Sequence, residues 1–247
     1  MIETVGLIVA TSAYSKRMKL SIVIPVYNEI RTIKTVIETV AKTLPDIDKE
    51  IVVVDDGSTD GTREWLSNYQ TDLFRLVLQP QNKGKGAALR AGFAAASGDV
   101  IVIQDADLEY DPRDWADMWW LIVEGKADVV FGSRFYGKPH RVLYFHHYLG
   151  NKTISMLLNL VCNTMLSDIE VCYKMFRKEV LKDVALTCDG FGFEVEFTMK
   201  VARAKRRWRL YEVGVAYYGR TYDEGKKISW KDGVRALWLI IWFWIRG

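Results

Sequence analysis

Acidic side chains follow several apolar runs of the chain, and their spacing suits chemistry on phosphates. Asp105 and Asp107 come directly after the apolar run 99–104 and are two residues apart, so both carboxylates face the same side of an extended chain. Hard oxygen ligands at this spacing suit Mg²⁺ or Mn²⁺ shared with a substrate diphosphate. A solvated acidic turn could have the same sequence, but the position of these residues directly after a buried strand favours metal binding.

A second acidic pair, Asp55 and Asp56, closes the apolar run 50–56. A carboxylate at this place can accept hydrogen bonds from a ribose hydroxyl or a base N–H. We interpret Asp56 as the ligand and residues 58–62 as turn and helix-cap residues. Tyr27 could stack on a base, whereas a lone tyrosine without acidic neighbours would be read as a core residue.

These acids need strands and helices to bring them together. Near-continuous apolar runs, typical of strands buried on both faces, span 20–27, 50–56, 73–79, 99–104 and 127–133. Helical spacing or small-residue runs between them predict helices over 29–44, 87–96 and 112–124. This alternation predicts an α/β fold with a mostly parallel, doubly wound sheet and helices on both faces. Ligands bind beyond the carboxyl ends of such strands, so we expect the acids that end them to gather at one edge.

Beyond residue 140 the pattern loosens, and we expect a C-terminal helical elaboration of one domain that spans 18–247. The expected elements are helices at 141–166 and 194–206 and short strands at 171–176 and 208–218. The apolar run 236–245 is too short for a bilayer span, which needs about 20 residues. The last helix, 231–246, either packs on the core or lies in a membrane interface, where tryptophan is favoured.

Composition bounds the class of protein. The chain has 247 residues, 49% of them hydrophobic, and a net charge of +3, so it is globular and gives no argument for a nucleic-acid partner. Its three cysteines form no CxxC pair, which argues against a zinc ribbon and fits a cytoplasmic location. In residues 1–17 an acid precedes the apolar stretch and basic residues follow it, the reverse of a signal peptide. We expect this extension to be dispensable.

Other phosphate-binding and catalytic motifs do not match. In the stretch 82–92, Lys85 is followed by Gly86, where a P-loop needs Ser or Thr, and Leu89 stands where a dinucleotide fingerprint needs glycine. We interpret this stretch as a helix N-terminus packed against the sheet, with Lys83 or Lys85 near phosphate. The histidines lie in no GxSxG or HExxH context, so a nucleophile–base triad is not supported.

Taken together, the strand-end strings resemble glycosyltransferase family 2, which has the GT-A fold. The strings are SIVIPVYNE (21–29), VVVDDGSTDGT (52–62), NKGKGAALRAGFAAASGDVIVIQDADLEYDP (82–112) and FGSR (131–134). Within the family, the last two look like the polyprenyl-phosphate sugar transferases of the dolichol-phosphate mannose synthase type. The later strings SDIEVCYKMFRKEV (167–180), GFGFEVEF (190–197) and YYGRTYDEGKKISWKDG (217–233) extend the similarity to nearly the whole chain.

The resemblance implies a role for particular residues. It implies that the nucleotide is held by Pro25, Tyr27, Glu29, Asp56 and Asp105, with Asp55 in support. The divalent metal, Mg²⁺ or Mn²⁺, is expected at Asp105, Asp107 and Glu109, although family members often have Gln where Glu109 stands. The acceptor phosphate and the loop over the phosphates are expected at Arg134, Arg177, Arg220 and Lys226, and the residues closest to the chemistry are Asp107, Asp168 and Arg134.

The resulting expectation is a metal-dependent, inverting transferase that moves a sugar from a GDP- or UDP-linked donor to polyprenyl phosphate. It would work as a peripheral protein at the cytoplasmic face of a membrane. A lipid phosphate is an anion at pH 7 and needs cations more than a base, whereas a hydroxyl acceptor needs a carboxylate base, for which Asp168 is the candidate.

Three alternatives remain at this stage. A family 2 transferase with a glycan or other hydroxyl acceptor would share the donor residues. A sugar-1-phosphate nucleotidyltransferase would need a glycine-rich loop with arginine after the first strand, where this chain has IPVYNE. A non-catalytic nucleotide-sugar-binding module is the third, and the intact pair Asp105 and Asp107 argues against it.

Overall fold

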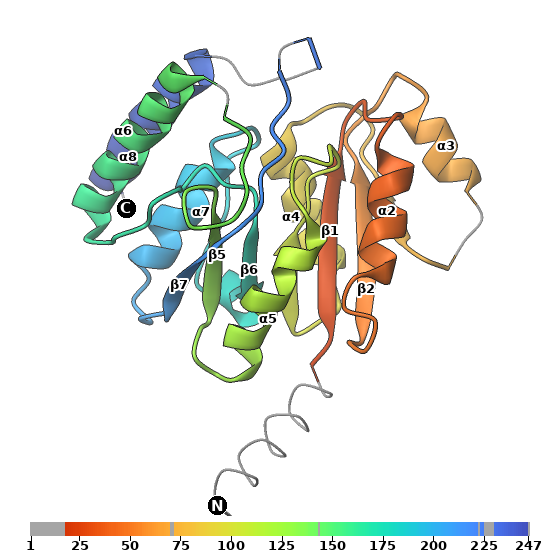
Figure 1. Cartoon of the computed structure of the whole chain (residues 1–247), viewed down its shortest axis with the longest axis horizontal. Helices are drawn as coiled ribbons and strands as arrows, with labels where there is room; N and C mark the ends of the chain where they lie inside the picture. Colours follow the sequence, from red (N-terminus) through yellow and green to blue (C-terminus); the bar gives the residue numbers. More distant parts are fainter. Residues whose placement is uncertain (1–17, 70–71, 143, 222, 225–229, 247) are drawn as a thin grey trace, which may run out of the picture.

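One seven-stranded sheet forms the centre of the protein, in the order β3-β2-β1-β4-β6-β5-β7 (Figure 1). The computed structural model describes residues 18–69, 72–142, 144–221, 223–224 and 230–246. The strands are β1 (Leu20–Val26), β2 (Lys49–Asp55), β3 (Arg75–Leu78), β4 (Val100–Ile103), β5 (Val129–Ser133), β6 (Lys174–Arg177) and β7 (Leu210–Gly214). Every neighbouring pair is parallel except the two that involve β6. The predicted α/β fold with a mostly parallel sheet is therefore confirmed.

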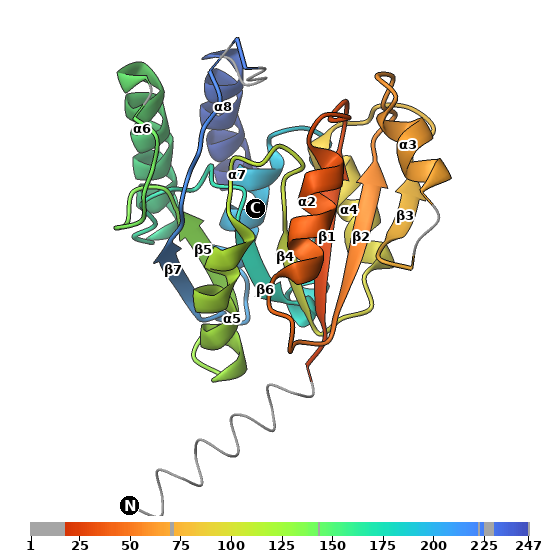
Figure 2. The ribbon, with the colours of Figure 1, turned by 45° about the vertical axis from the view of Figure 1, so that its right-hand side comes forward.

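Helices cover both faces of this sheet. They are α2 (Ile33–Lys42), α3 (Thr62–Asn68), α4 (Lys85–Ala95), α5 (Trp115–Val123), α6 (Phe145–Cys162), α7 (Phe193–Ala202) and α8 (Trp230–Arg246). Two short 3₁₀ helices, η1 (Pro112–Asp114) and η2 (Lys178–Lys182), precede α5 and follow β6. In two views, α2 and α5 lie on one face of the sheet and α4 and α7 on the other (Figures 1 and 2).

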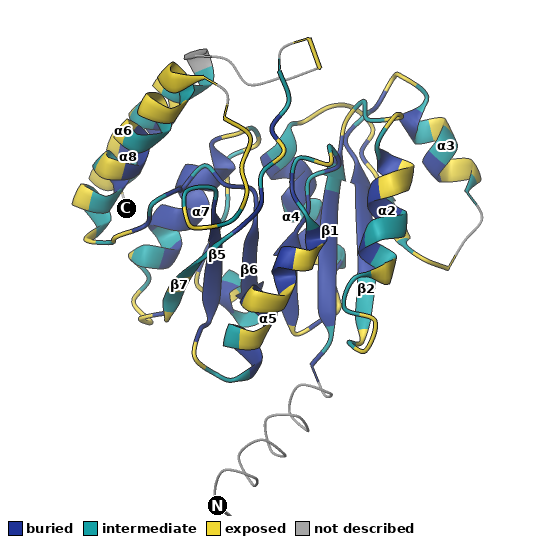
Figure 3. Ribbon diagram, viewed as in Figure 1, coloured by how far each residue is buried: buried dark blue, intermediate teal, exposed yellow. Residues whose placement is uncertain are grey.

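The core follows directly from the apolar pattern. β1, β2, β4 and β5 are almost entirely buried, as Figure 3 shows, because helices cover both of their faces. The amphipathic helix α2 buries Ile33, Val36, Ile37 and Val40. The small-residue helix α4 comes much closer to the sheet: a Cβ atom at Gly92 would lie 2.3 Å from Val23 Cγ1. Gly92 therefore lets α4 lie close against β1 and β2, whose residues Val23 and Val54 it contacts.

The antiparallel direction of β6 is the main departure from the simple alternation. β6 follows α6, which lies at the carboxyl edge of the sheet, so the chain enters the sheet from that edge without crossing back. The residues just before β6 are therefore held at the carboxyl edge, and its last residue, Arg177, pairs with Val100 at the start of β4.

The helices α6 and α8 pack beside the sheet rather than on its central strands. A single helix, α6, occupies most of the range expected for one or two helices at 141–166, and the last helix runs as α8 over nearly the range expected for it. α6 and α8 lie side by side in both views (Figures 1 and 2), and α8 also packs on α7. The extension 1–17 lies outside the described residues.

We predict that Gly92→Ala destabilises the protein by about 1–3 kcal/mol, because the added methyl group overpacks the contact with Val23. Gly150→Ala is the matched control: it lies in α6, and apart from its own helix no atom of the described residues comes within 4 Å of a Cβ placed there. That change should be neutral or stabilise by about 0.5–1 kcal/mol. Thermal or urea unfolding measures both, and equal effects would contradict the close packing of α4.

Candidate active site

A cavity of about 1480 Å³ opens at the carboxyl edge of the sheet and extends to α6 and α8. Its walls include ten of the side chains singled out in the sequence: Pro25, Tyr27, Glu29, Asp56, Lys85, Asp105, Asp107, Glu109, Arg134 and Arg220. Pro25 lies near the end of β1, and the others come from loops that follow β1, β2, β4 and β5, from the start of α4 and from the segment after β7. The fold thus brings most of the expected site residues together in one place.

Hydrogen bonds between loops fix the part of the cavity near β1 and β2. The backbone N–H of Asn28 donates to Ser58 Oγ (3.0 Å), and Thr59 N–H donates to Asn28 Oδ1 (2.8 Å). The carboxylate of Asp56 accepts two backbone N–H bonds of 2.8 Å from residues 83 and 84. Burial nevertheless raises the pKa of Asp56. A carboxylate held this firmly at the cavity wall is suited to accept a hydrogen bond from a bound nucleoside.

Asp55 has a different place from its neighbour. Its side chain is fully buried and accepts a 2.6 Å bond from Arg63 Nε and a 3.2 Å bond from the N–H of Gly57. Asp55 is not among the residues that line the cavity. It holds the loop that carries Asp56.

The guanidinium of Arg220 lies among three carboxylates. Its Nη2 atom is 3.0 Å from Asp107 Oδ2 and 3.5 Å from Glu29 Oε1. Its Nε lies 3.4 Å from Glu109 Oε1, which also accepts a 2.8 Å bond from the backbone N–H of Arg220. Tyr217 donates its hydroxyl to the other oxygen of Glu109 at 3.1 Å. The segment after β7 is thereby tied to the acids that follow β1 and β4.

Charge crowding remains at Asp107 despite this arginine. Burial, together with the negative charges of Asp105 and Glu109, raises the pKa of Asp107 to about 7, and Arg220 acts in the opposite direction. Opposite charge nearby favours the ionised form of a carboxyl and like charge disfavours it. An additional cation at this place would therefore stabilise the ionised site.

Asp105 faces a second basic residue. Lys85 Nζ lies 2.9 Å from Asp105 Oδ1 and 3.2 Å from Glu194 Oε1. Glu194 also pairs with the fully buried Lys174. The sequence suggested Lys85 near a phosphate, and the structure places it against Asp105 at the cavity wall. This chain of alternating charges fixes the position of Asp105.

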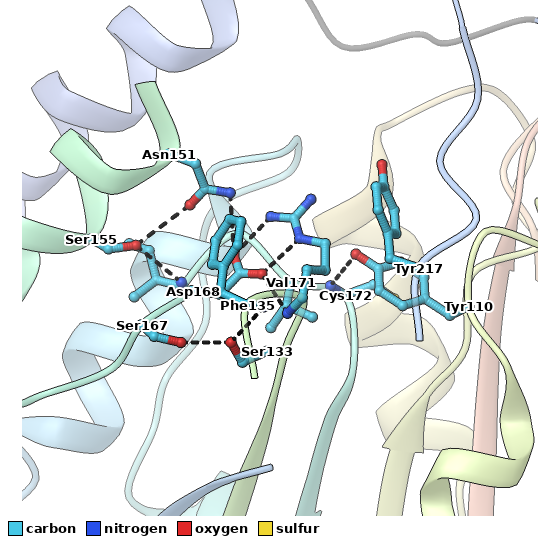
Figure 4. A network of polar contacts seen from close by, with 12 residues as sticks. Tyr110, Ser133, Phe135, Asn151, Ser155, Ser167, Asp168, Val171, Cys172 and Tyr217 are labelled. Carbon is cyan, nitrogen blue, oxygen red and sulfur yellow. Dashed lines mark hydrogen bonds and ion pairs between the residues drawn. The ribbon is translucent and has the colours of Figure 1, made fainter. Parts of the chain in front are cut away.

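Arg134 and Asp168 form a bidentate ion pair at the cavity wall, and Figure 4 shows Asp168 among its neighbours. Arg134 Nε donates to Asp168 Oδ2 at 2.6 Å and Nη2 donates to Oδ1 at 2.7 Å. Asn151 of α6 donates to the same carboxylate at 3.2 Å. Burial would raise the pKa of Asp168, but the charge and hydrogen bonds of Arg134 outweigh it and keep this pKa below its ordinary value. Arg134 lines the cavity, whereas Asp168 lies behind it.

The position of Arg177 corrects one expectation. Arg177 ends β6 and therefore lies at the opposite edge of the sheet, where Nη2 donates to Ile122 O at 2.8 Å and Nε faces Asp128 at 3.5 Å. It was expected beside the acceptor phosphate, but the antiparallel course of β6 carries it away from the cavity. Lys226, expected over the phosphates, lies outside the described residues.

Sequence reasoning gave no role to three residues that the fold brings to the cavity, Tyr217, Glu170 and Glu194. All three lie within the later strings that carry the resemblance, but their spacing has no pattern of its own. Tyr217 contacts Glu109 across 108 residues, and Glu194 contacts Lys85 of α4. A string match alone could have marked the three residues as candidates, but only the folded chain shows what surrounds them.

The donor set at the carboxyl edge suits a hard divalent cation. Asp105 and Asp107 both line the cavity with carboxylate oxygens, and the negative charge of Asp105 contributes to the raised pKa of Asp107, so a cation there would relieve the repulsion. Among the described residues no group of three Asp, Glu, His or Cys side chains is arranged as a complete metal site. Mg²⁺ is commonly held by one or two carboxylates together with substrate phosphates, so a partial protein site fits this metal.

Comparison with known proteins finds a matching family and relatives whose names contain both a lipid phosphate and a sugar. Residues 21–185 match the model of "Glycosyl transferase family 2". The chain is 30% identical over 220 residues to a dolichol-phosphate mannosyltransferase of Pyrococcus furiosus, which covers 85% of this chain and 61% of that protein. It is 27% identical over 232 residues to a dodecaprenyl-phosphate galacturonate synthase of Rhizobium johnstonii, which covers 92% and 67%. The chain thus spans about three fifths to two thirds of the length of these relatives.

Solved structures show the same fold. Glucosyl-3-phosphoglycerate synthase of Mycobacterium tuberculosis, crystallised with Mg²⁺ and UDP, superposes with a TM-score of 0.70 at 22% identity, over 94% of this chain and 83% of that one. A complex of the same enzyme with Mn²⁺, UDP and phosphoglyceric acid superposes with a TM-score of 0.68, also at 22% identity, over 88% of this chain and 76% of that one. These likenesses establish the GT-A fold. The match over residues 21–185 shows that the chain belongs to glycosyltransferase family 2.

Proposed function

We propose that this protein is a metal-dependent, inverting glycosyltransferase that moves a sugar from a GDP- or UDP-linked donor to a polyprenyl phosphate at a membrane surface. The observation that carries the proposal is the single cavity with two unlike ends. Acidic residues that suit a nucleotide and a metal line one end, and Arg134 with apolar side chains of α6 and α8 lines the other.

The acidic end suits the donor. Pro25, Tyr27, Glu29 and Asp56 surround the space for a nucleoside, and Tyr27 is exposed enough for its ring to stack on a base. Asp105, Asp107 and, with them, Glu109 would hold Mg²⁺ or Mn²⁺, which neutralises the charge that develops on the leaving diphosphate. Arg220 already contacts Asp107 and lies where it can reach the same phosphates.

The other end suits an acceptor with a phosphate head and an apolar chain. Arg134 presents a cation to the cavity, and a guanidinium recognises phosphate through paired hydrogen bonds. The wall beyond Arg134 is mainly apolar and includes Phe135, Tyr148, Leu149, Val234 and Leu237. A phosphate oxygen that attacks the sugar directly, in one displacement, gives inversion.

A hydroxyl acceptor fits this end less well. Such an acceptor needs a carboxylate base within reach, and Asp168 was the candidate. Asp168 is fully buried and both of its oxygens are engaged by Arg134. The names of the two relatives described above agree with a lipid acceptor, since they specify dolichol and dodecaprenyl phosphates.

Exposed residues lie along α6 and α8 (Figure 3), and the apolar ones among them support a place at a membrane surface. At helical spacing they form one stripe on each helix: Phe145, Leu149, Met156 and Leu160 on α6, and Val234, Trp238, Ile241 and Ile245 on α8. No helix within the described part of the chain is long and apolar enough to cross a membrane. We propose that the two stripes enter the interface of the cytoplasmic leaflet, and the three free cysteines agree with a reducing compartment.

The proposal predicts sugar transfer from a panel of UDP- and GDP-sugars to short-chain polyprenyl phosphate with Mg²⁺ or Mn²⁺, and none to the free polyprenol. The double variant Arg134→Gln/Asp168→Asn removes both charges of the buried pair together. We expect it to lose about ten- to hundred-fold in transfer, since a charge-assisted bond contributes about 1.5–3 kcal/mol, while donor hydrolysis by water changes little.

The matched control is Arg209→Gln/Asp128→Asn. This pair is also bidentate, with distances of 2.9 and 2.7 Å, and it lines no part of the cavity. It should leave transfer within about two-fold, which is below 0.5 kcal/mol. Equal losses of transfer and hydrolysis in the Arg134 variant would argue against a phosphate acceptor, and absence of transfer from every donor would overturn the function.

We further predict that the metal-free protein becomes less stable as the pH rises from about 5 to 8. Burial raises the pKa values of Asp107, Glu170 and Glu212 to about 7, so the folded chain binds more protons than the unfolded chain in this window. Stability is therefore lost as these groups ionise. Tm should fall by at least about 2–4 °C, which corresponds to about 1 kcal/mol.

Adding Mn²⁺ with UDP or GDP at pH 8 should recover this loss, because metal ligands bind in their deprotonated form. Asp107→Asn should reduce both the pH dependence and the recovery, as scanning calorimetry can measure. If Asp107→Asn recovers as fully as the unaltered protein, the assignment of Asp107 to the metal is wrong.

The membrane proposal predicts that Trp238→Glu weakens co-flotation with vesicles of phosphatidylglycerol and phosphatidylcholine by at least about five-fold, because a charge replaces buried apolar area. Trp120→Glu is the control: Trp120 on α5 is 52% exposed and Trp238 is 55% exposed. Flotation that drops equally for both variants, or for neither, would contradict a lipid-facing α8.

A further inference from the structure

Glu170 is a cavity residue that the binding of nucleotide, metal and acceptor phosphate leaves unused. It lies in the segment between α6 and β6 and lines the cavity. Its Oε1 atom is buried and has no hydrogen-bond partner among the described residues. A buried carboxyl oxygen without a partner is unfavourable, so such an atom in a cavity wall indicates a bond that a ligand supplies.

The chain places Glu170 between the two ends of the cavity. Two residues before it, Asp168 pairs with Arg134 at the acceptor end. Two residues after it, Cys172 also lines the cavity, and burial and then the negative charge of Asp105 at the donor end raise the pKa of its thiol. The segment 168–172 therefore bridges the two ends, and its middle residue faces the space in which the transferred group must lie.

The basic residues around Glu170 are already engaged. Lys174 binds Glu194 and the carbonyl groups of Ile169 and Val171, and Arg134 binds Asp168. Burial and then the charge of Glu194 raise the pKa of Glu170 to about 7. Each neighbouring cation thus has another acid as its partner, and the carboxyl of Glu170 keeps its capacity to accept a hydrogen bond.

We propose that Glu170 accepts a hydrogen bond from a hydroxyl of the transferred sugar and selects neutral sugars over uronates. This inference rests on the proposed function, since it assumes a nucleotide-sugar donor. A uronate would bring a further negative charge close to Glu170 and Glu194 in a buried place. A neutral sugar instead supplies the O–H donor that Oε1 lacks.

The test is calorimetric binding with Mn²⁺, using UDP, UDP-glucose and UDP-glucuronate, and GDP, GDP-mannose and GDP-mannuronate. The comparison is made in whichever series, UDP or GDP, binds to the protein. There, Glu170→Ala should weaken binding of the neutral nucleotide sugar about ten-fold relative to binding of the nucleoside diphosphate alone. Glu170→Gln keeps an acceptor oxygen without the charge. This variant should bind the neutral nucleotide sugar with a dissociation constant within a few-fold of that of the unaltered protein. It should bind the nucleotide uronate about ten-fold more tightly.

The control is Glu124→Gln, an acid at the end of α5 that pairs with Lys126 and lines no part of the cavity. It should leave every ratio of dissociation constants unchanged. If nucleotides bind but both Glu170 variants keep the ratios of the unaltered protein, the role of Glu170 is overturned and the proposed function stands. If no nucleotide or nucleotide sugar binds, both are overturned.

Discussion

Negative charges crowded into a buried place repel each other, and the cavity of this protein is built around that repulsion. Parallel strands bring Asp105 and Asp107 to one edge of the sheet, while Lys85 and Arg220 lie against them. The pKa of Asp107 remains at about 7, so these two cations balance the acids only in part. Under the proposed function, a divalent metal and a diphosphate complete the balance, which couples donor binding to the ionisation of the site.

The reversal of β6 joins this acidic end to the acceptor end. Because β6 enters the sheet from the carboxyl edge, the segment 168–172 lies across the cavity, with Asp168 behind Arg134 and Glu170 facing the space between. α6 and α8, packed side by side, then supply the apolar wall that continues to the exposed stripes. A phosphate with a long apolar chain matches that sequence of surfaces.

The sequence by itself was sufficient for the features that depend on local pattern and strand direction. Continuous apolar runs followed by helical spacing predicted the parallel sheet, and residues such as Asp56, Asp105 and Asp107 follow strands whose carboxyl ends must share one edge. The strings around these residues also predicted the family, which the match over residues 21–185 confirms. Acids at strand ends reveal the location of the site because the strand next to each of them in sequence also fixes its place in the fold.

Tertiary structure alone decided which charges meet. Arg177 lies in a string that resembles the family, yet the direction of β6 carries it to the opposite edge of the sheet. Arg134 meets Asp168 across 34 residues, and Arg220 meets Glu109 across 111. Such pairs depend on how distant segments pack, and no local period encodes that packing. For the same physical reason, the unpartnered oxygen of Glu170 becomes visible only in the folded chain.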